Sequence, residues 1–171
     1  MIHKVLNLLA LKINLTFKMK NNKPFFILMF ITAFLSSCSI LKTAPYDQYS
    51  FQKTIEIKID ANQLIDKAEN SYEENSKEIE KLQNEIAKIV EYEKYKPNNE
   101  ITYKMWLLLA DQDKNLLAGF LKRWKEKDKL SPFFITEAKA QITEAFNLLL
   151  EYESKKEPAT KNKLLELIFK N

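Results

Sequence analysis

The chain of 171 residues holds only one glycine, one cysteine and one histidine, and each scarcity excludes a class of site. Gly119 alone cannot build a glycine-rich phosphate loop, and Cys38 alone cannot form an intramolecular disulfide. Because His3 is the only histidine, the chain after Cys38 has neither His nor Cys. That segment therefore lacks the residues of Ser-His-Asp and Cys-His nucleophiles and of zinc sites with nitrogen and sulfur ligands. We expect a protein that is not an enzyme and uses no cofactor.

A calcium-like run does not change this expectation. Asp111, Asp113 and Asn115 have the spacing of the first three ligands of a calcium-binding loop. The next fixed positions should be glycine and glutamate, but Leu116 and Lys122 occupy them. We interpret the run as a helix kink or a short polar loop and expect no metal.

Charge is distributed unevenly along the chain. Residues 1–37 contain five of the 27 basic residues and no acid, which leaves 22 basic and 23 acidic residues in the remainder. The net charge of +4 thus comes from the N-terminal segment. Nucleic-acid binding needs a concentrated basic surface, and the remainder holds a single arginine, Arg123. We expect no nucleic-acid partner.

The N-terminal segment has the order of a secretory signal peptide. Basic residues from Met19 to Lys23 precede an apolar run over residues 24–35, and small residues follow it. The run is too short to cross a bilayer, which takes about 20 residues. We predict cleavage between Ser37 and Cys38.

Residues 35–38, Leu-Ser-Ser-Cys, resemble the lipobox of bacterial lipoproteins. The resemblance implies that Cys38 is acylated, becomes the first residue of the mature chain and anchors it to a membrane of the bacterial cell envelope. It also implies that Ser39, in place of aspartate, permits transfer to the outer membrane. The alternative is that Cys38 is an ordinary cysteine in an apolar leader.

These observations divide the chain into four parts. A second apolar stretch over residues 5–17 would make a leader that starts at Met1 unusually long, so we expect residues 1–18 not to be translated and Met19 to be the start. Residues 19–37 are the signal peptide, 38–50 a lipidated tether and 51–171 a helical bundle domain.

The composition of residues 51–171 predicts an all-α fold, a three- to four-helix bundle, because this part is poor in glycine and rich in Lys, Glu, Leu and Ile. A long first helix over 60–95, with Asp60 as N-cap, has apolar residues at alternating spacings of three and four, as in a coiled coil. Further helices are expected over 101–127, from Ser131 onward and over 158–170. The residues of the coiled-coil seam are Ile65, Ala68, Tyr72, Asn75, Ile79, Leu82, Ile86 and Ile89.

Three details stay open at this level. Asn75 in the seam either sets the register of a buried contact or marks a more exposed point. Residues 51–59 alternate like a strand, which would have to pair with another molecule, but they also form a helical face, and we favour the helix. Gly119 beside Ala118 is expected to let a neighbouring helix approach closely.

A possible partner surface is formed by the run Lys122, Arg123, Trp124 and Lys125, since Arg and Trp are enriched in interface hot spots. The alternative is that Trp124 belongs to the core and the cations to the polar face of its helix.

The function expected from these features is that of a membrane-anchored envelope lipoprotein, a structural or protein-interaction module whose partners are the lipid bilayer and another envelope protein. One alternative is an inhibitor or immunity-like lipoprotein. Another is a carrier of a small apolar ligand, with Trp106, Phe120 and Trp124 lining a pocket between helices.

Overall fold

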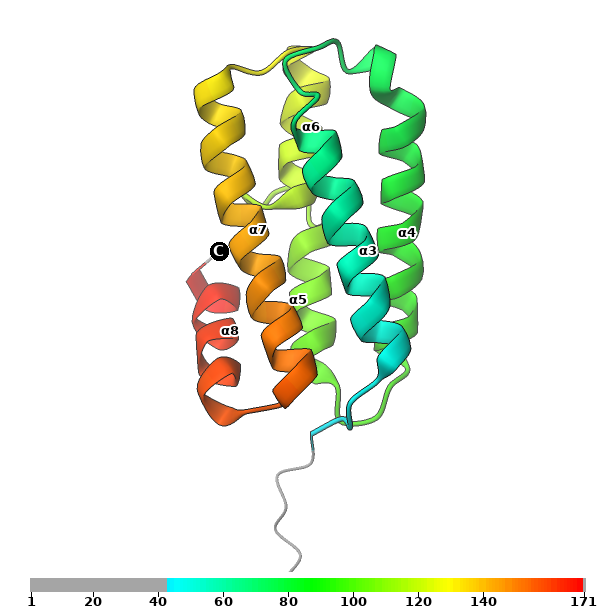
Figure 1. Ribbon diagram of the computed structural model, residues 1–171, viewed down its shortest axis with the longest axis vertical. Coiled ribbons are helices and arrows are strands. Elements are labelled where there is room, and N and C mark those ends of the chain that lie inside the picture. Colours follow the sequence, from blue (N-terminus) through cyan, green and yellow to red (C-terminus); the bar gives the residue numbers. More distant parts are fainter. Residues whose placement is uncertain (1–42, 171) are drawn as a thin grey trace, which may run out of the picture. The chain divides into compact units, whose positions relative to one another are not determined.

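The structure, a computed structural model, describes residues 43–170, and every regular element in this range is helical (Figure 1). The elements are α3 (Gln48–Ile65), the 3-10 turn η1 (Glu73–Asn75), α4 (Ser76–Lys94), α5 (Glu100–Ala110), α6 (Leu117–Lys127), α7 (Pro132–Lys155) and α8 (Pro158–Lys170). The all-α prediction is confirmed for this range, and so is the helix over residues 51–59. Met19, the signal peptide, the cleavage site at Ser37 and the lipidation site at Cys38 lie outside the described residues.

The helices pack side by side around one core. α3 contacts α7 and α4, α4 contacts α5, and α8 packs against both α7 and α5. Figure 1 shows α5 and α6 following one another along the same column, with α5 nearer the end at which the chain enters α3. The largest fully buried side chains are Trp106, Trp124, Phe146, Ile57, Ile65, Ile79, Ile89, Met105, Leu109, Leu116, Leu117 and Leu121.

The prediction of one long helix over 60–95 is wrong. α3 ends at Ile65, and the chain reverses through residues 66–75 before α4 begins. Two backbone hydrogen bonds fasten this turn to the connection between α6 and α7: Tyr72 N donates to Asp128 O at 2.9 Å, and Leu130 N donates to Ala68 O at 2.8 Å. The apolar spacing continues across the reversal because both antiparallel helices face the same core.

The predicted seam is thus not one helix face: Ile65 belongs to α3, the last four residues belong to α4, and Ala68, Tyr72 and Asn75 lie in the connection between them. On α4 the spacing holds, since Ile79, Leu82, Ile86 and Ile89 are all buried. Neither interpretation of Asn75 is correct, because this residue is buried in the turn, where its Nδ2 donates to Ser71 O at 3.0 Å.

The folded domain begins earlier in the chain than predicted. Asp47, and not Asp60, caps the first helix, and its Oδ1 accepts hydrogen bonds from Tyr49 N at 3.0 Å and Ser50 N at 3.3 Å. Ala44 is already buried, and its N–H donates to Asn98 O at 2.9 Å. The predicted tether over 38–50 is therefore too long, since residues 43–50 belong to the domain.

The predicted helix over 101–127 is interrupted. α5 ends at Ala110 and α6 begins at Leu117, with a polar loop between them in which Asp111 Oδ1 accepts from Asp113 N at 2.9 Å. Of the two interpretations of the calcium-like run, the short polar loop is thus confirmed and the helix kink is wrong. The helices that follow agree with prediction: Ser131 caps α7 by accepting from Phe134 N, and Pro132 lies in its first turn.

The loop also explains Gly119, which was assigned to the approach of a neighbouring helix. A Cβ atom at this position would lie 1.8 Å from the carbonyl oxygen of Lys114. Glycine is needed because the backbone of the loop passes directly over the first turn of α6. The close approach is therefore local, and the expectation of a helix contact is wrong.

Side chains also join α3 to α4. Lys53 Nζ lies 2.6 Å from Glu85 Oε2, and Lys88 Nζ lies 2.7 Å from Glu85 Oε1. The hydrogen bonds from these two lysines stabilise the carboxylate and lower the pKa of Glu85 to about 2.

This shift predicts a pH-dependent contribution of Glu85 to stability. A carboxyl whose pKa is lower in the folded than in the unfolded chain stabilises the fold above its unfolded pKa, and this contribution is lost as pH falls through the folded pKa. The difference in unfolding free energy between wild type and Glu85→Gln should therefore be constant near neutral pH and shrink between the ordinary value of 4.5 and about 2. Urea titrations across this range measure it; a difference independent of pH would contradict the assignment.

Candidate functional site

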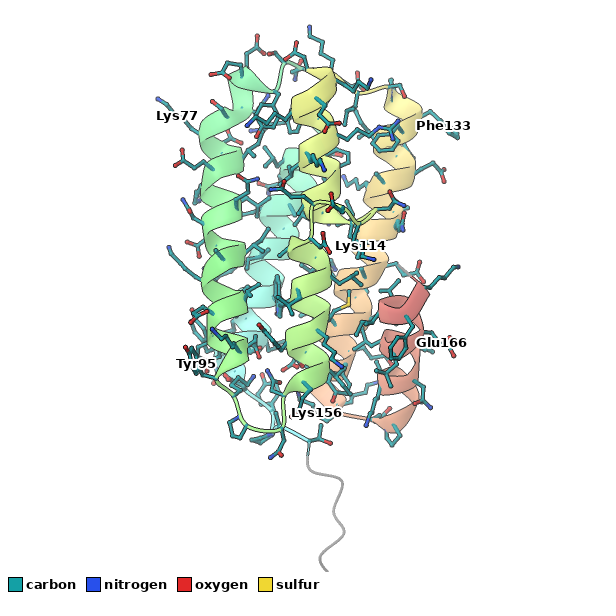
Figure 2. All side chains as sticks on the ribbon, turned by 180° about the vertical axis from the view of Figure 1, so that it is seen from behind. Lys77, Tyr95, Lys114, Phe133, Lys156 and Glu166 are labelled. Atoms are coloured by element: carbon teal, nitrogen blue, oxygen red, sulfur yellow. The ribbon has the colours of Figure 1, made fainter. Side chains whose placement is uncertain are left out.

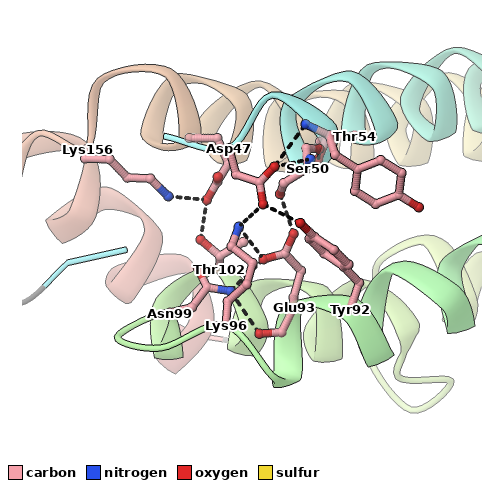
Figure 3. Close-up of polar contacts among 11 residues, drawn as sticks. Asp47, Ser50, Thr54, Tyr92, Glu93, Lys96, Asn99, Thr102 and Lys156 are labelled. Atoms are coloured by element: carbon pink, nitrogen blue, oxygen red, sulfur yellow. Dashed lines mark hydrogen bonds and ion pairs between the residues drawn. The ribbon is translucent and has the colours of Figure 1, made fainter. Parts of the chain in front are cut away.

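Apart from Asn75, in the turn at 66–75, the polar side chains that are buried among the described residues gather at one end of the helices. We call this the basal end: here the chain enters α3 from Thr43, α4 gives way to α5, and α7 gives way to α8 (Figure 1). Figure 3 shows the contacts made there by two charged groups from different helices, together with the side chains that hydrogen-bond to them.

The first group is Glu93, in the last turn of α4, which is fully buried. Its carboxylate accepts hydrogen bonds from Ser50 Oγ of α3 and from Asn99 Nδ2, at 2.6 Å in the latter case. Lys96 Nζ lies 3.0 Å from Glu93 Oε2 and forms an ion pair with it. One carboxylate thus joins the start of α3, the end of α4 and the residue that precedes α5 (Figure 3).

The second group is Glu153, in the last turn of α7, which is also fully buried. Its Oε1 accepts hydrogen bonds from Thr102 Oγ1 of α5 and from Lys156 Nζ, the latter at 2.6 Å. The nitrogen of Lys156 also lies 4.8 Å from the centre of the Tyr152 ring, which places the cation over an aromatic face. This carboxylate joins α5 to the connection between α7 and α8.

A third acid, Asp47, lies at the outer edge of the cluster. Tyr92 OH donates to Asp47 Oδ2 at 2.6 Å, and this hydrogen bond, with partial burial, raises the pKa of Tyr92 to about 12. Partial burial acts to raise the pKa of Asp47 as well. The hydrogen bonds from Tyr92 and the Ser50 N–H outweigh this effect, and the pKa of Asp47 lies below its ordinary value.

The chemistry of the cluster suits a structural role. A buried carboxylate is tolerated when it is paired and hydrogen-bonded, and each glutamate has a lysine three residues further along and a hydroxyl donor. We interpret the cluster as the brace that holds the basal end together. The apolar periodicity does not predict the brace, although a signal is present in the sequence: a Glu-x-x-Lys spacing recurs at 93–96 and 153–156, each followed within two residues by proline.

Outside this brace, the basal end exposes a group of aromatic side chains. The rings of Tyr49 and Tyr92 pack at a tilt of 58° with 4.7 Å between their centres, and Lys94 Nζ lies 5.1 Å from the ring centre of Tyr95. Tyr46, at the start of the domain, contacts Phe51 at 5.9 Å. We call Tyr46, Tyr49, Tyr92 and Tyr95 the tyrosine rim.

A second candidate site is a groove between α6 and α7 with a volume of about 410 Å³. Its floor contains Phe120 and Phe134, whose rings are parallel within 1° at 6.0 Å. The guanidinium carbon of Arg123 lies 4.4 Å from the centre of the Phe134 ring, so the cation covers this aromatic face. Polar residues surround the floor, namely Asn115, Glu137, Gln141 and Glu144.

The predicted partner surface is only partly formed. Arg123 is exposed and lines the groove, and Lys122 and Lys125 are exposed beside it. Trp124 is fully buried, and its Nε1 donates to Asn70 O at 3.1 Å and to Asp128 O at 3.0 Å. Its assignment to the surface is wrong and the alternative, that it belongs to the core, is correct: the indole lies on the core side of α6 and bonds to the turn at 66–75 and to the connection between α6 and α7.

The pocket predicted from aromatic residues is not formed by the three side chains together. Trp106 and Trp124 are fully buried, and Trp106 packs edge-on against Phe146 with 6.0 Å between ring centres. Phe120 alone of the three predicted residues borders the groove between α6 and α7.

Within residues 43–170, no three His, Cys, Asp or Glu side chains are grouped so that they could hold a metal ion. In the same range no helix combines the length and the apolar character needed to cross a membrane. Comparisons of the chain with protein-family models, curated proteins and solved structures found no match.

The brace yields a prediction about stability. Glu93→Gln should lower the unfolding free energy by about 3 kcal/mol, because it leaves Lys96 with only its ion pair to the partly exposed Asp47, at 3.3 Å, and places an amide donor against other donors. The matched control is Glu91→Gln on the same helix, which removes an exposed ion pair with Lys94 and should cost less than about 1 kcal/mol. Urea denaturation measures both; equal effects would contradict the role given to Glu93.

Proposed function

We propose that this chain is a lipoprotein of the bacterial cell envelope, acylated at Cys38 after cleavage behind Ser37 and held at the outer membrane. In this proposal the helical domain is not an enzyme. It binds another envelope protein, as a structural or interaction module.

The observation that carries the proposal is the short distance along the chain between the lipobox and the folded domain. Ala44 is buried and hydrogen-bonded, so only residues 39–42 separate Cys38 from the described structure. At about 3.3–3.6 Å per residue the Cα atoms of Cys38 and Thr43 lie within roughly 18 Å of each other. A signal-like segment that ends just ahead of a domain is the order expected for a processed and anchored precursor.

The interaction surface that we propose is the groove beside Arg123. Arginine and aromatic side chains are enriched among residues that dominate binding energy, and here Arg123 lies over Phe134 at the rim of a concave site. Acidic side chains at Glu137 and Glu144 give the groove both signs of charge, which suits a protein segment better than an apolar small molecule. The same surface would serve an inhibitor or immunity-like factor, and the identity of the partner separates these two functions.

The anchor is tested by expressing the full chain in a bacterium that processes lipoproteins and labelling the cells with palmitate. The wild type should incorporate label, partition with membranes and yield a mature N-terminus at Cys38. Cys38→Ser should lose the label and the processing, because the thioether cannot form. A mature wild-type chain that is unlabelled and leaves the membrane fraction would refute the proposal.

The partner site is tested with a photo-crosslinking amino acid at Gln141, which lines the groove, in intact cells. A discrete protein adduct is expected, and Arg123→Glu should reduce its yield about tenfold, the effect of a loss of ~1.4 kcal/mol. Lys125→Glu is the matched control, since Lys125 is exposed on the same helix and does not line the groove. The same adducts from a crosslinker at Glu80, exposed on α4, would contradict a specific site.

A further inference from the structure

We propose that the tyrosine rim is a membrane-docking surface, which places the basal end of the domain against the lipid headgroups of the bilayer that holds Cys38. This inference rests on the acylation proposed above and extends it, because an anchor alone leaves the orientation of the domain undetermined.

The first argument is the position of the rim. The described chain starts at Thr43, at the basal end, and Tyr46 and Tyr49 follow within the next residues. Figure 2 shows Tyr95 and Lys156 at this end of the helices and Lys77 and Phe133 at the opposite end. Because residues 39–42 span at most roughly 18 Å between Cys38 and Thr43, the basal end cannot move far from an acylated Cys38.

The second argument is the composition of the exposed surface. Among the described residues, the large apolar or aromatic side chains that are well exposed include all four tyrosines of the rim: Tyr46 at 53%, Tyr49 at 50%, Tyr92 at 39% and Tyr95 at 73%. Tyrosine is enriched at membrane–water interfaces, since its ring is apolar while its hydroxyl can remain hydrated. At the opposite end the corresponding exposed aromatic residue is Phe133.

The charged side chains at the basal end determine how deeply the tyrosine rim can enter the membrane. Lys94 is exposed beside Tyr95, where it pairs with Glu91 at 3.5 Å and can also meet a lipid phosphate, whereas the carboxylates of Glu93 and Glu153 are buried and paired within the brace. Glu100 and Glu157 remain exposed at the basal end and oppose insertion into hydrocarbon. The rim therefore suits the headgroup layer and not the acyl-chain region.

Weak affinity is sufficient for such a surface. A short tether holds it at an effective concentration on the order of millimolar relative to the membrane. Docking that would be undetectable for the free domain is then populated for the anchored one. The rim is held rigidly, because the brace joins the two helices that carry Tyr49 and Tyr92. Ser50 of α3 donates a hydrogen bond to Glu93 of α4.

The experiment uses the acylated chain, purified from cells and reconstituted into vesicles of phosphatidylethanolamine and phosphatidylglycerol that contain a lipid with a nitroxide on its headgroup. The acylated Cys38 has no free thiol, so a fluorophore can be attached to one introduced cysteine. Glu91→Cys and Lys77→Cys place it on exposed positions of α4, about 21 Å apart along the helix axis. Quenching at position 91 should exceed quenching at position 77 several-fold.

The variant that removes the rim combines Tyr46→Ser, Tyr49→Ser and Tyr95→Ser in the Glu91→Cys chain. It should reduce quenching at position 91 to the level seen at position 77, whereas Phe133→Ser should leave quenching unchanged. All four positions are at least half exposed, so the fold should survive, and circular dichroism checks this.

Flotation of the vesicles separates the two proposals. A chain that floats with the vesicles but shows equal quenching at positions 77 and 91 keeps its anchor and overturns the docking. Retained quenching in the triple variant also overturns it. A chain that does not float contradicts the acylation and with it the docking. If the basal end contacts only a protein partner, position 91 stays unquenched in these vesicles, which hold no other protein. This result also overturns the inference.

Discussion

The structure depends most on the buried carboxylate of Glu93. It takes hydrogen bonds from Ser50 on α3 and Asn99 before α5, and it pairs with Lys96 directly after α4, so three chain segments meet at one charge. An unpaired charge buried in this place would strongly destabilise the fold. The contacts of Glu93 with its three partners must therefore form together. Glu153 repeats this arrangement between α5 and α7, with Thr102 and Lys156 as its partners.

The two ends of the domain differ in chemistry, because both buried glutamates lie at the basal end. The basal end combines a rigid polar interior with exposed tyrosines and the point at which the chain emerges. The half of the domain opposite the basal end contains the groove between α6 and α7, where Arg123 covers Phe134. If the basal end faces lipid, the groove lies in the half of the domain that is further from the membrane.

Periodicity predicted which residues are buried better than it predicted where helices end. Ile79, Leu82, Ile86 and Ile89 lie on the core side of α4, as their spacing indicates. The same spacing ran on from Ile65 through Asn75, yet the chain reverses there, because an antiparallel neighbour presents its apolar residues to the same core. Likewise, the spacing allowed Trp124 either at a partner surface or in the core, and only packing shows that its side chain is fully buried.

The sequence alone determined the helical class, the cap at Ser131 and the expectation of a lipid anchor, since composition and local motifs control these features. It left the run from Asp111 to Asn115 as either a helix kink or a polar loop. It also determined that residues 43–170 lack histidine and cysteine. Tertiary structure decided the reversal at 66–75 and the pairing of Glu93 with Ser50. These depend on contacts between residues far apart in the chain, and such contacts leave no regular spacing in the sequence from which they could be predicted.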